Sequence, residues 1–159
     1  MRYEELRSKY PVFRYDSFEL EKTPTRAIAR FRFSAPPDIS FSPEIIFESL
    51  PGGWHSVADK FLNNAIFHLG LIELFSYWKA TASPVIEIHA GGLILEQTRF
   101  WDDILIHGMG EFFYQNDIDF TAPNFVKFAS SGNRMVIPYL PALPQRSLLT
   151  IGGGRDSAL

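Results

Sequence analysis

The residues best suited to chemistry lie near the carboxyl end of this 159-residue chain, in a glycine-rich turn. The turn reads Gly152-Gly153-Gly154-Arg155-Asp156-Ser157 and follows an apolar run at 148–151. Glycines reach positive φ and let the backbone approach a ligand with no Cβ in the way. Successive N–H groups then converge on an anion, and a following helix N-terminus adds its positive end. We therefore predict a phosphate-binding loop, with spacing unlike that of a Walker loop; the alternative is an ordinary glycine turn.

A second group of polar residues falls inside a predicted helix. His107, Glu111 and Tyr114 are spaced i, i+4 and i+7, which places them on one helical face. Gly108 and Gly110 lie between them, and each costs about 1 kcal/mol in a helix relative to alanine, so we expect close packing or a ligand there. A histidine and a glutamate one turn apart suit acid–base work or metal binding. In the alternative, His107 is hydrogen-bonded in the core and Glu111 faces water.

Two further polar segments lie at the expected ends of helices. Lys79 closes the run Ser-Tyr-Trp-Lys at 76–79, and a lysine near a helix C-terminus suits the dipole without any function. The segment 114–119 is either the edge of a polar pocket or a helix C-cap with Asn116 in the left-handed region. His68 falls in the apolar first helix, where we expect a satisfied core histidine.

The first third of the chain has the alternation of strands. Residues 26–33 alternate apolar and polar positions, which predicts a half-buried strand after a turn at 22–25. The alternation slips by one position between Tyr15 and Phe18, which predicts a β-bulge.

Two long helices and one short strand are expected next. A broad apolar stripe predicts a helix from Ser56, in a capping-box-like start with Asp59, to about residue 80, ending before Pro84. A short strand at 85–88 and a second helix at 95–116 follow. Prolines at 138, 141 and 144 indicate an extended connection and a domain boundary at about residue 140.

Composition narrows the class of protein. The chain is 46% hydrophobic, with 15 Phe, 6 Tyr and 3 Trp, and is long enough for a real core. A net charge of −3 with scattered basic residues gives no electrostatic footprint for nucleic acid. There is no cysteine, no apolar run of about 18 residues and no signal-peptide pattern at the N-terminus. We expect a cytoplasmic protein without membrane insertion.

Three segments, in their order along the chain, resemble the UDP-N-acetylmuramoyl-L-alanyl-L-glutamate epimerase family (MurL-type). They are Ser-Tyr-Trp-Lys at 76–79, His-Gly-Met-Gly-Glu-Phe-Phe-Tyr-Gln-Asn-Asp-Ile-Asp at 107–119, and the glycine turn with its preceding strand at 149–157. The family carries Ser-Tyr-aromatic-Lys, His-Gly-x-Gly-Glu-Phe-x-Tyr-x-Asn and Gly-Gly-Gly-Lys-Asp-Ser there. Arg155 replaces that lysine, which keeps the charge but not its geometry. The turn also resembles the Ser-Gly-Gly-x-Asp-Ser loop of the ATP-pyrophosphatase superfamily, with Gly152 in place of the leading serine.

The pattern and the resemblance together predict an α+β fold. We expect a small, mainly antiparallel sheet from the N-terminal third, packed on the two long helices, within a domain at 1–140. Residues 141–159 would form a linker, then the first strand and glycine loop of a truncated α/β ATP-pyrophosphatase-like domain. A doubly wound nucleotide domain needs a helix and further strands after such a loop. We therefore expect the N-terminal fragment of a longer enzyme, inactive alone.

The resemblance implies an ATP-dependent isomerase of peptidoglycan precursor synthesis, which inverts the terminal L-glutamate of UDP-N-acetylmuramoyl-L-Ala-L-Glu. Its ATP would adenylate the glutamate carboxylate and release pyrophosphate to the loop, with Mg²⁺ or Mn²⁺ assisted by Asp156. The implied catalytic candidates are Asp156, Ser157, His107 and Glu111. The implied pyrophosphate-binding residues are Gly152, Gly153, Gly154, Arg155, Asp156 and Ser157, and the substrate candidates are Tyr77, Lys79, Tyr114 and Asn116.

Two other classes of protein fit the residues. One is a different adenylating enzyme with a pyrophosphate loop, either tRNA-modifying or amide-forming. The other is a non-catalytic α+β module in which the glycines form only a turn. We expect the reading frame beyond residue 159 to separate the three, because a completed nucleotide domain supports an enzyme.

Overall fold

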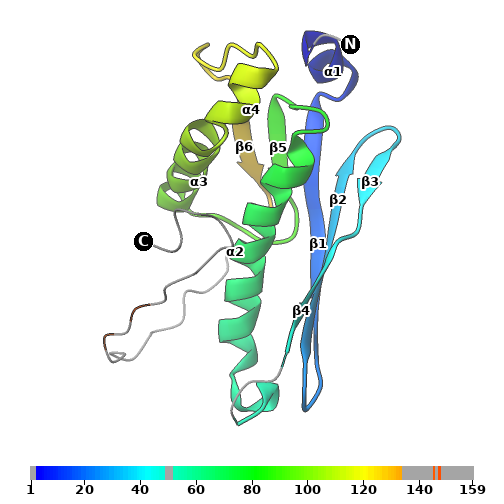
Figure 1. Cartoon of the computed structure of the whole chain (residues 1–159), viewed down its shortest axis with the longest axis vertical. Coiled ribbons are helices and arrows are strands. Elements are labelled where there is room, and N and C mark those ends of the chain that lie inside the picture. Colours follow the sequence, from blue (N-terminus) through cyan, green and yellow to red (C-terminus); the bar gives the residue numbers. More distant parts are fainter. Residues whose placement is uncertain (1–2, 49–51, 134–144, 146, 148–159) are drawn as a thin grey trace, which may run out of the picture.

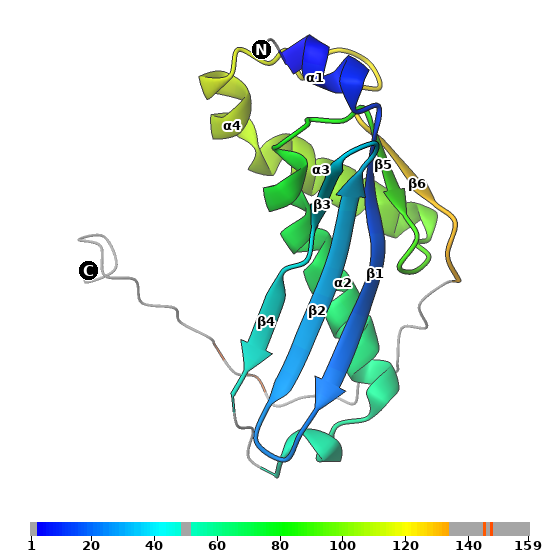
Figure 2. The same ribbon diagram turned by 90° about the vertical axis from the view of Figure 1, so that its right-hand side faces the viewer.

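The computed structural model describes residues 3–48, 52–133, 145 and 147. Six strands form one sheet in the order β3-β2-β1-β5-β6, and β4 also pairs with β2. Helices α2, α3 and α4 lie on one side of this sheet, and α1 lies at its end (Figures 1 and 2). In chain order the elements are α1 (Tyr3–Lys9), β1 (Val12–Lys22), β2 (Ala27–Ala35), β3 (Ile39–Phe41), β4 (Glu44–Phe47), the 3-10 turn η1 (Trp54–Ser56), α2 (Asp59–Trp78), β5 (Val85–Ile88), α3 (Leu95–Gly108), α4 (Gly110–Gln115) and β6 (Lys127–Ser130).

The long hairpin β1–β2 forms as the alternation predicts. Its antiparallel register runs from the pair Arg14–Ser34 to the pair Lys22–Ala27, around the expected turn. The register shifts between Tyr15 and Ser17, which confirms the predicted bulge. Every second residue of β2 is buried under α2, whereas the intervening residues, including Arg30, lie on the open face. Arg30 bridges the carboxylates of Glu21 and Glu44 at 2.9 and 2.7 Å, so this open face is charged and hydrated.

The expected antiparallel character of the sheet is wrong in one half, because the sheet is mixed. β5 pairs with β1 in parallel, from Val12–Val85 to Tyr15–Ile88, and β6 pairs with β5 in parallel. Parallel neighbours need a crossover connection, usually a helix. Here α2 precedes β5, and α3 with α4 connects β5 to β6. Strands from outside the N-terminal third therefore complete the sheet.

Two short elements were not predicted. The strand β6 has only four residues, begins with Lys127 and ends with Ser130, so its sequence carries little alternation. The signals of the helix α1 are the acidic residues of its first turn, the basic residues of its last turn and the apolar spacing of Tyr3, Leu6 and Tyr10. The guanidinium of Arg7 fixes α1 to the rest of the fold by donating to the Ala82 carbonyl at 2.6 Å and to the Phe125 carbonyl. Burial lowers the pKa of Arg7.

The helix boundaries differ from the expected ones. Ser56 does not cap α2, because it lies in η1 and its hydroxyl donates to the Gly53 carbonyl, while α2 begins at Asp59. The predicted helix 95–116 is two helices that meet at Met109, where φ is −103° and ψ is 15°. Gly108 and Gly110 flank this junction, and their low helix propensity favours a break there.

The centre of the core is aromatic and lies between α2 and the sheet. Gly70 of α2 sits directly over Tyr15 and Phe31, where a Cβ would overlap the Tyr15 hydroxyl. The Tyr15 ring stacks on Phe67 at 5.9 Å between ring centroids. The boundary expected at about residue 140 and the segment 141–159 lie outside the described residues, apart from residues 145 and 147.

Candidate functional site

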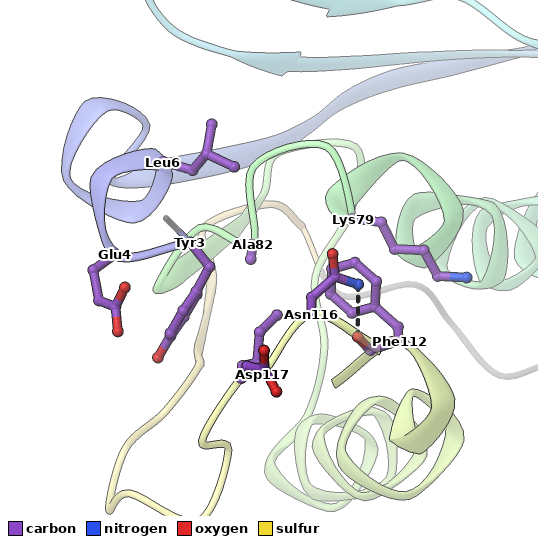
Figure 3. Close-up of a pocket in the computed structure, with 9 residues that line it drawn as sticks. Tyr3, Glu4, Leu6, Lys79, Ala82, Phe112, Asn116 and Asp117 are labelled. Atoms are coloured by element: carbon purple, nitrogen blue, oxygen red, sulfur yellow. Dashed lines mark hydrogen bonds between the residues drawn. The ribbon is translucent and has the colours of Figure 1, made fainter. Parts of the chain in front are cut away.

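A pocket of about 490 Å³ lies where the ends of three helices meet (Figure 3). The first turn of α1, the C-terminal end of α2 and the C-terminal end of α4 each contribute side chains. Two of the residues singled out from the sequence, Lys79 and Asn116, are thereby brought into one site although 37 positions separate their numbers. The full lining is Tyr3, Glu4, Leu6, Lys79, Ala82, Phe112, Asn116, Asp117 and Ile118.

Lys79 supplies a positive charge at the edge of this pocket. It is the C-cap of α2, where the helix dipole favours a cation. Its Nζ lies 6.0 Å from the centroid of the Phe112 ring. Among the described residues it has no acidic partner within ion-pair distance. This ammonium group can therefore pair with a carboxylate or phosphate of a ligand without first breaking an internal ion pair.

Asn116 supplies an amide next to Lys79. Its Nδ2 donates to the Phe112 carbonyl at 2.8 Å, which orients the side chain and leaves Oδ1 as an acceptor (Figure 3). Asn116 has a φ of −111°, and the residue in the left-handed region is Asp117, with a φ of 53°. The expected cap with Asn116 in that region is therefore displaced by one residue. Asp117 also faces the pocket.

The other end of the pocket is acidic and aromatic. Figure 3 shows Tyr3 and Glu4 from α1 across the cavity from Phe112, with Asp117 between them beside Asn116. The carboxylates of Glu4 and Asp117 can accept hydrogen bonds from amide or hydroxyl groups. The sequence motifs contain neither Tyr3 nor Glu4, and the local signals of α1 indicate a helix without placing it at this pocket. The pocket thus has a cationic end and an anionic end about an aromatic wall.

His107 and Glu111 do not face each other across one continuous helix. The Nδ1 atom of His107 lies 3.0 Å from the carbonyl oxygen of Asp103 and 3.1 Å from its carboxylate, one turn back in α3. Glu111 accepts from the amide of Gln115 at 2.9 Å, within α4. The break at Met109 separates the two residues into different helices, and both side chains are exposed.

Four more residues singled out from the sequence do not line this pocket: Gly108, Gly110, Tyr114 and Tyr77. A Cβ added to Gly108 or Gly110 would meet nothing within 4 Å, so close packing among the described residues does not explain them. Tyr114 is 85% exposed and borders a second, shallow hollow beside Phe120. Tyr77 points to the sheet, with its ring 4.9 Å from Phe41, so its contacts are those of a packing residue.

The segment 152–157, predicted to be a pyrophosphate loop, lies outside the described residues. The Mg²⁺ or Mn²⁺ expected at Asp156 therefore has no geometry to compare. Elsewhere, over residues 3–48 and 52–133, His, Cys, Asp and Glu side chains nowhere gather in threes in a way that would hold a metal ion. No helix within those ranges has both the length and the apolar character needed to cross a membrane.

Comparison with known proteins decides the family. Residues 4–159 match the family model described as the MurL N-terminal domain. This chain belongs to that family. A curated relative, the UDP-N-acetyl-alpha-D-muramoyl-L-alanyl-L-glutamate epimerase of Xanthomonas oryzae pv. oryzae (strain MAFF 311018), is 29% identical over 106 residues. The match covers 67% of this chain but 22% of the relative, so the chain spans about a fifth of the relative's length. No solved structure matches the chain.

The match confirms the resemblance drawn from the three sequence segments. The first segment, at 76–79, ends α2, and the second, at 107–119, spans the junction of α3 with α4. In the fold of this MurL N-terminal domain the two segments are neighbours in space as well as in motif order. Their contact is the approach of Lys79 to Phe112 beside Asn116. The geometry thus assigns the family motifs two different tasks: Tyr77 packs, whereas Lys79 and Asn116 line a pocket.

Proposed function

We propose that this chain is the N-terminal part of an ATP-dependent epimerase that inverts the terminal L-glutamate of UDP-N-acetylmuramoyl-L-Ala-L-Glu, a step of peptidoglycan precursor synthesis. The observation that carries the proposal is the match of residues 4–159 to the MurL N-terminal domain, together with a relative named as that epimerase. The glycine loop ending in Asp156 and Ser157 supports the use of ATP, because its residue types suit a leaving pyrophosphate.

Adenylation gives the epimerisation a physical rationale. The α-proton beside a free carboxylate is a poor acid, because its removal places two negative charges on adjacent atoms. Joining the carboxylate to AMP cancels one charge and releases pyrophosphate. The Cα–H proton then leaves from one face, a proton returns to the other face, and hydrolysis of the acyl-adenylate yields AMP and the D-glutamate product.

We assign the pocket at the helix ends to substrate binding. Lys79 would pair with an anionic group of the substrate, either a carboxylate or the diphosphate, and Asn116 would accept a hydrogen bond through Oδ1. The carboxylates of Glu4 and Asp117 suit the hydroxyl and amide donors of a muramoyl peptide. His107, Glu111 and Tyr114 lie on the exposed side of α3 and α4, where they would act only if another part of the protein covers them.

The direct test is AMP formation by the protein that contains this chain. We expect AMP with UDP-N-acetylmuramoyl-L-Ala-L-Glu and ATP, and none with tRNA or with other carboxylates. Asp156→Asn and Ser157→Ala should each lower the rate by about 10²–10³, the usual cost of one lost transition-state contact. AMP formed only with tRNA or another carboxylate would instead identify a different adenylating enzyme. Near-normal rates in both variants would remove the loop from the mechanism.

The pocket is tested separately through Lys79. Lys79→Ala should raise KM for the UDP-linked substrate about tenfold or more, since a hydrogen bond to a charged group is worth about 1.5–3 kcal/mol. The matched control is Lys60→Ala, which removes an exposed lysine from the first turn of the same helix and should leave KM unchanged. Equal effects of the two variants would exclude the pocket as the substrate site. We also propose that the 159-residue chain alone forms no AMP, because it spans 22% of the relative.

A further inference from the structure

The outer surface of α2 and α3 carries large apolar side chains that the described residues leave uncovered. Ile72 of α2 is 53% exposed, and Phe100 and Ile104 of α3 are 55% and 39% exposed. These three residues, with His68 and Trp101 at their base, define what we call the outer α2–α3 face. Surface isoleucines and phenylalanines are unremarkable singly, but a contiguous group of them indicates an interaction site.

Contacts between the two helices join their apolar stripes at Trp101. His68 stacks on Trp101 at 5.8 Å between ring centroids, and Phe75 meets the same indole at 6.0 Å. Ile72 lies between His68 and Phe75 on one helical stripe, because the spacing is i, i+4 and i+7. On α3, the ring centroids of Phe100 and Trp101 lie 5.1 Å apart, and Ile104 lies one helical turn after Phe100.

A hollow of about 420 Å³ opens in this face. His68, Phe100 and Trp101 form its apolar walls, and Glu96 and Gln97 border it. Further acidic residues, Glu73 on α2 and Asp103 on α3, lie on the same two helices. The face thus offers an apolar hollow bordered by the carboxylate of Glu96 and the amide of Gln97, unlike the open side of the sheet, where Arg30 and its glutamates pair with each other.

The described chain ends next to this face. β6 ends at Ser130, whose hydroxyl accepts from the backbone N–H of Leu93, directly before α3. Gly132 touches the backbone of Gly91 in the same loop. The polypeptide therefore leaves the described domain beside the first turn of α3, which borders the hollow. More than three quarters of the relative lies outside the region matched by this chain. A protein of that length therefore has a large part, beyond this domain, that is available to pack against it.

We infer that the outer α2–α3 face is the docking surface for the domain that follows the MurL N-terminal domain in the same polypeptide. That domain would bury Ile72, Phe100 and Ile104 under apolar side chains of its own and would place basic residues opposite Glu96 and Glu73. The inference concerns assembly rather than the reaction, so it stands or falls independently of the substrate.

Cysteine labelling tests the inference, because the chain has no cysteine of its own. Phe100→Cys and Ile72→Cys are introduced separately into the complete protein and into the 159-residue chain, and modification by a maleimide is followed on the relevant peptide by mass spectrometry. The control is Glu19→Cys, an exposed position on the open side of the sheet.

We expect both face positions to react about 100-fold more slowly in the complete protein than in the 159-residue chain, as for groups exposed only by local opening. Glu19→Cys should react equally fast in both. Rates at Phe100→Cys and Ile72→Cys that agree within about threefold between the two proteins would overturn the inference. Slow labelling in the 159-residue chain that speeds up on dilution would also overturn it, in favour of a second copy of the chain.

Discussion

At the scale of single residues, Tyr15 shows how one side chain sets the approach of α2 to the sheet. Its ring is fully buried among Phe31, Phe33 and Phe67, and its hydroxyl lies under Gly70. Among the described residues that hydroxyl has no hydrogen-bond partner, and burial raises the pKa of the phenol. A buried donor left without a partner costs about 1–3 kcal/mol, so the hydroxyl works against the stability that the ring supplies.

Tyr15→Phe should therefore leave the free energy of unfolding unchanged or raise it by up to about 1–3 kcal/mol. The ring and its stacking are kept, and only the unpaired hydroxyl is removed. Urea unfolding of the two proteins measures the difference, with Tyr3→Phe as a control on a partly exposed tyrosine of α1. A loss of more than about 1 kcal/mol would show that the hydroxyl is hydrogen-bonded after all.

His68 gives a prediction of pH dependence. Burial lowers the pKa of its imidazole, which stacks on Trp101 and lies 3.4 Å from the Gln97 amide nitrogen. The unfolded chain therefore binds a proton at a pH where the folded chain does not, and the contribution of His68 to stability is full only above the unfolded value of about 6.5. As the pH falls from there toward the lower folded pKa, the free energy of unfolding should fall.

Urea unfolding between about pH 5 and pH 8 measures this slope. His68→Gln should flatten it, whereas His55→Gln, at an exposed position in η1, should keep it. The same slope in the His68 variant as in the parent would rule out His68 as its source.

At the scale of elements, the contact of α2 with the sheet depends on the absence of one side chain. A Cβ at Gly70 would overlap Tyr15 and lie 2.9 Å from the Phe31 ring. Gly70→Ala should therefore lower the free energy of unfolding by about 1–3 kcal/mol, because the added methyl group overpacks the core and moves α2 away from the sheet. Gly108→Ala is the matched control: its Cβ would meet nothing within 4 Å, and alanine at this helical position should stabilise by up to about 1 kcal/mol. Equal effects of the two substitutions in chemical denaturation would contradict this packing.

Periodicity predicts those elements whose burial is one-sided. The alternation in β2 and the register shift at Tyr15 could be predicted from the sequence, because one face of the hairpin packs on α2 and the other meets water. The pairing of β5 with β1 could not be predicted, because a four-residue apolar strand has no local feature that fixes its neighbour or direction. The break at Met109 is not predicted either, because two glycines in a helical pattern are equally consistent with close packing, a ligand contact or the end of a helix.

At the scale of the whole molecule, the fold joins residues that the sequence motifs single out separately. Lys79 and Asn116 were found separately from the ends of predicted helices, and the fold joins them in one pocket. Tyr3 and Glu4 could not be found in this way, because α1 is held beside the pocket by long-range contacts, such as those of Arg7 with Ala82 and Phe125. The assignment of Asp156 and Ser157 remains a prediction, outside the described residues.

The central claim is that the protein containing this MurL N-terminal domain inverts glutamate through an adenylated carboxylate. The most direct measurement is solvent deuterium incorporation at the glutamate Cα of UDP-N-acetylmuramoyl-L-Ala-L-Glu in D₂O, with chiral analysis of the glutamate. We expect deuterium in the D-glutamate product, formed only when ATP is present and accompanied by AMP. D-glutamate formed without ATP, or AMP formed while the Cα keeps its proton and its L configuration, would contradict it.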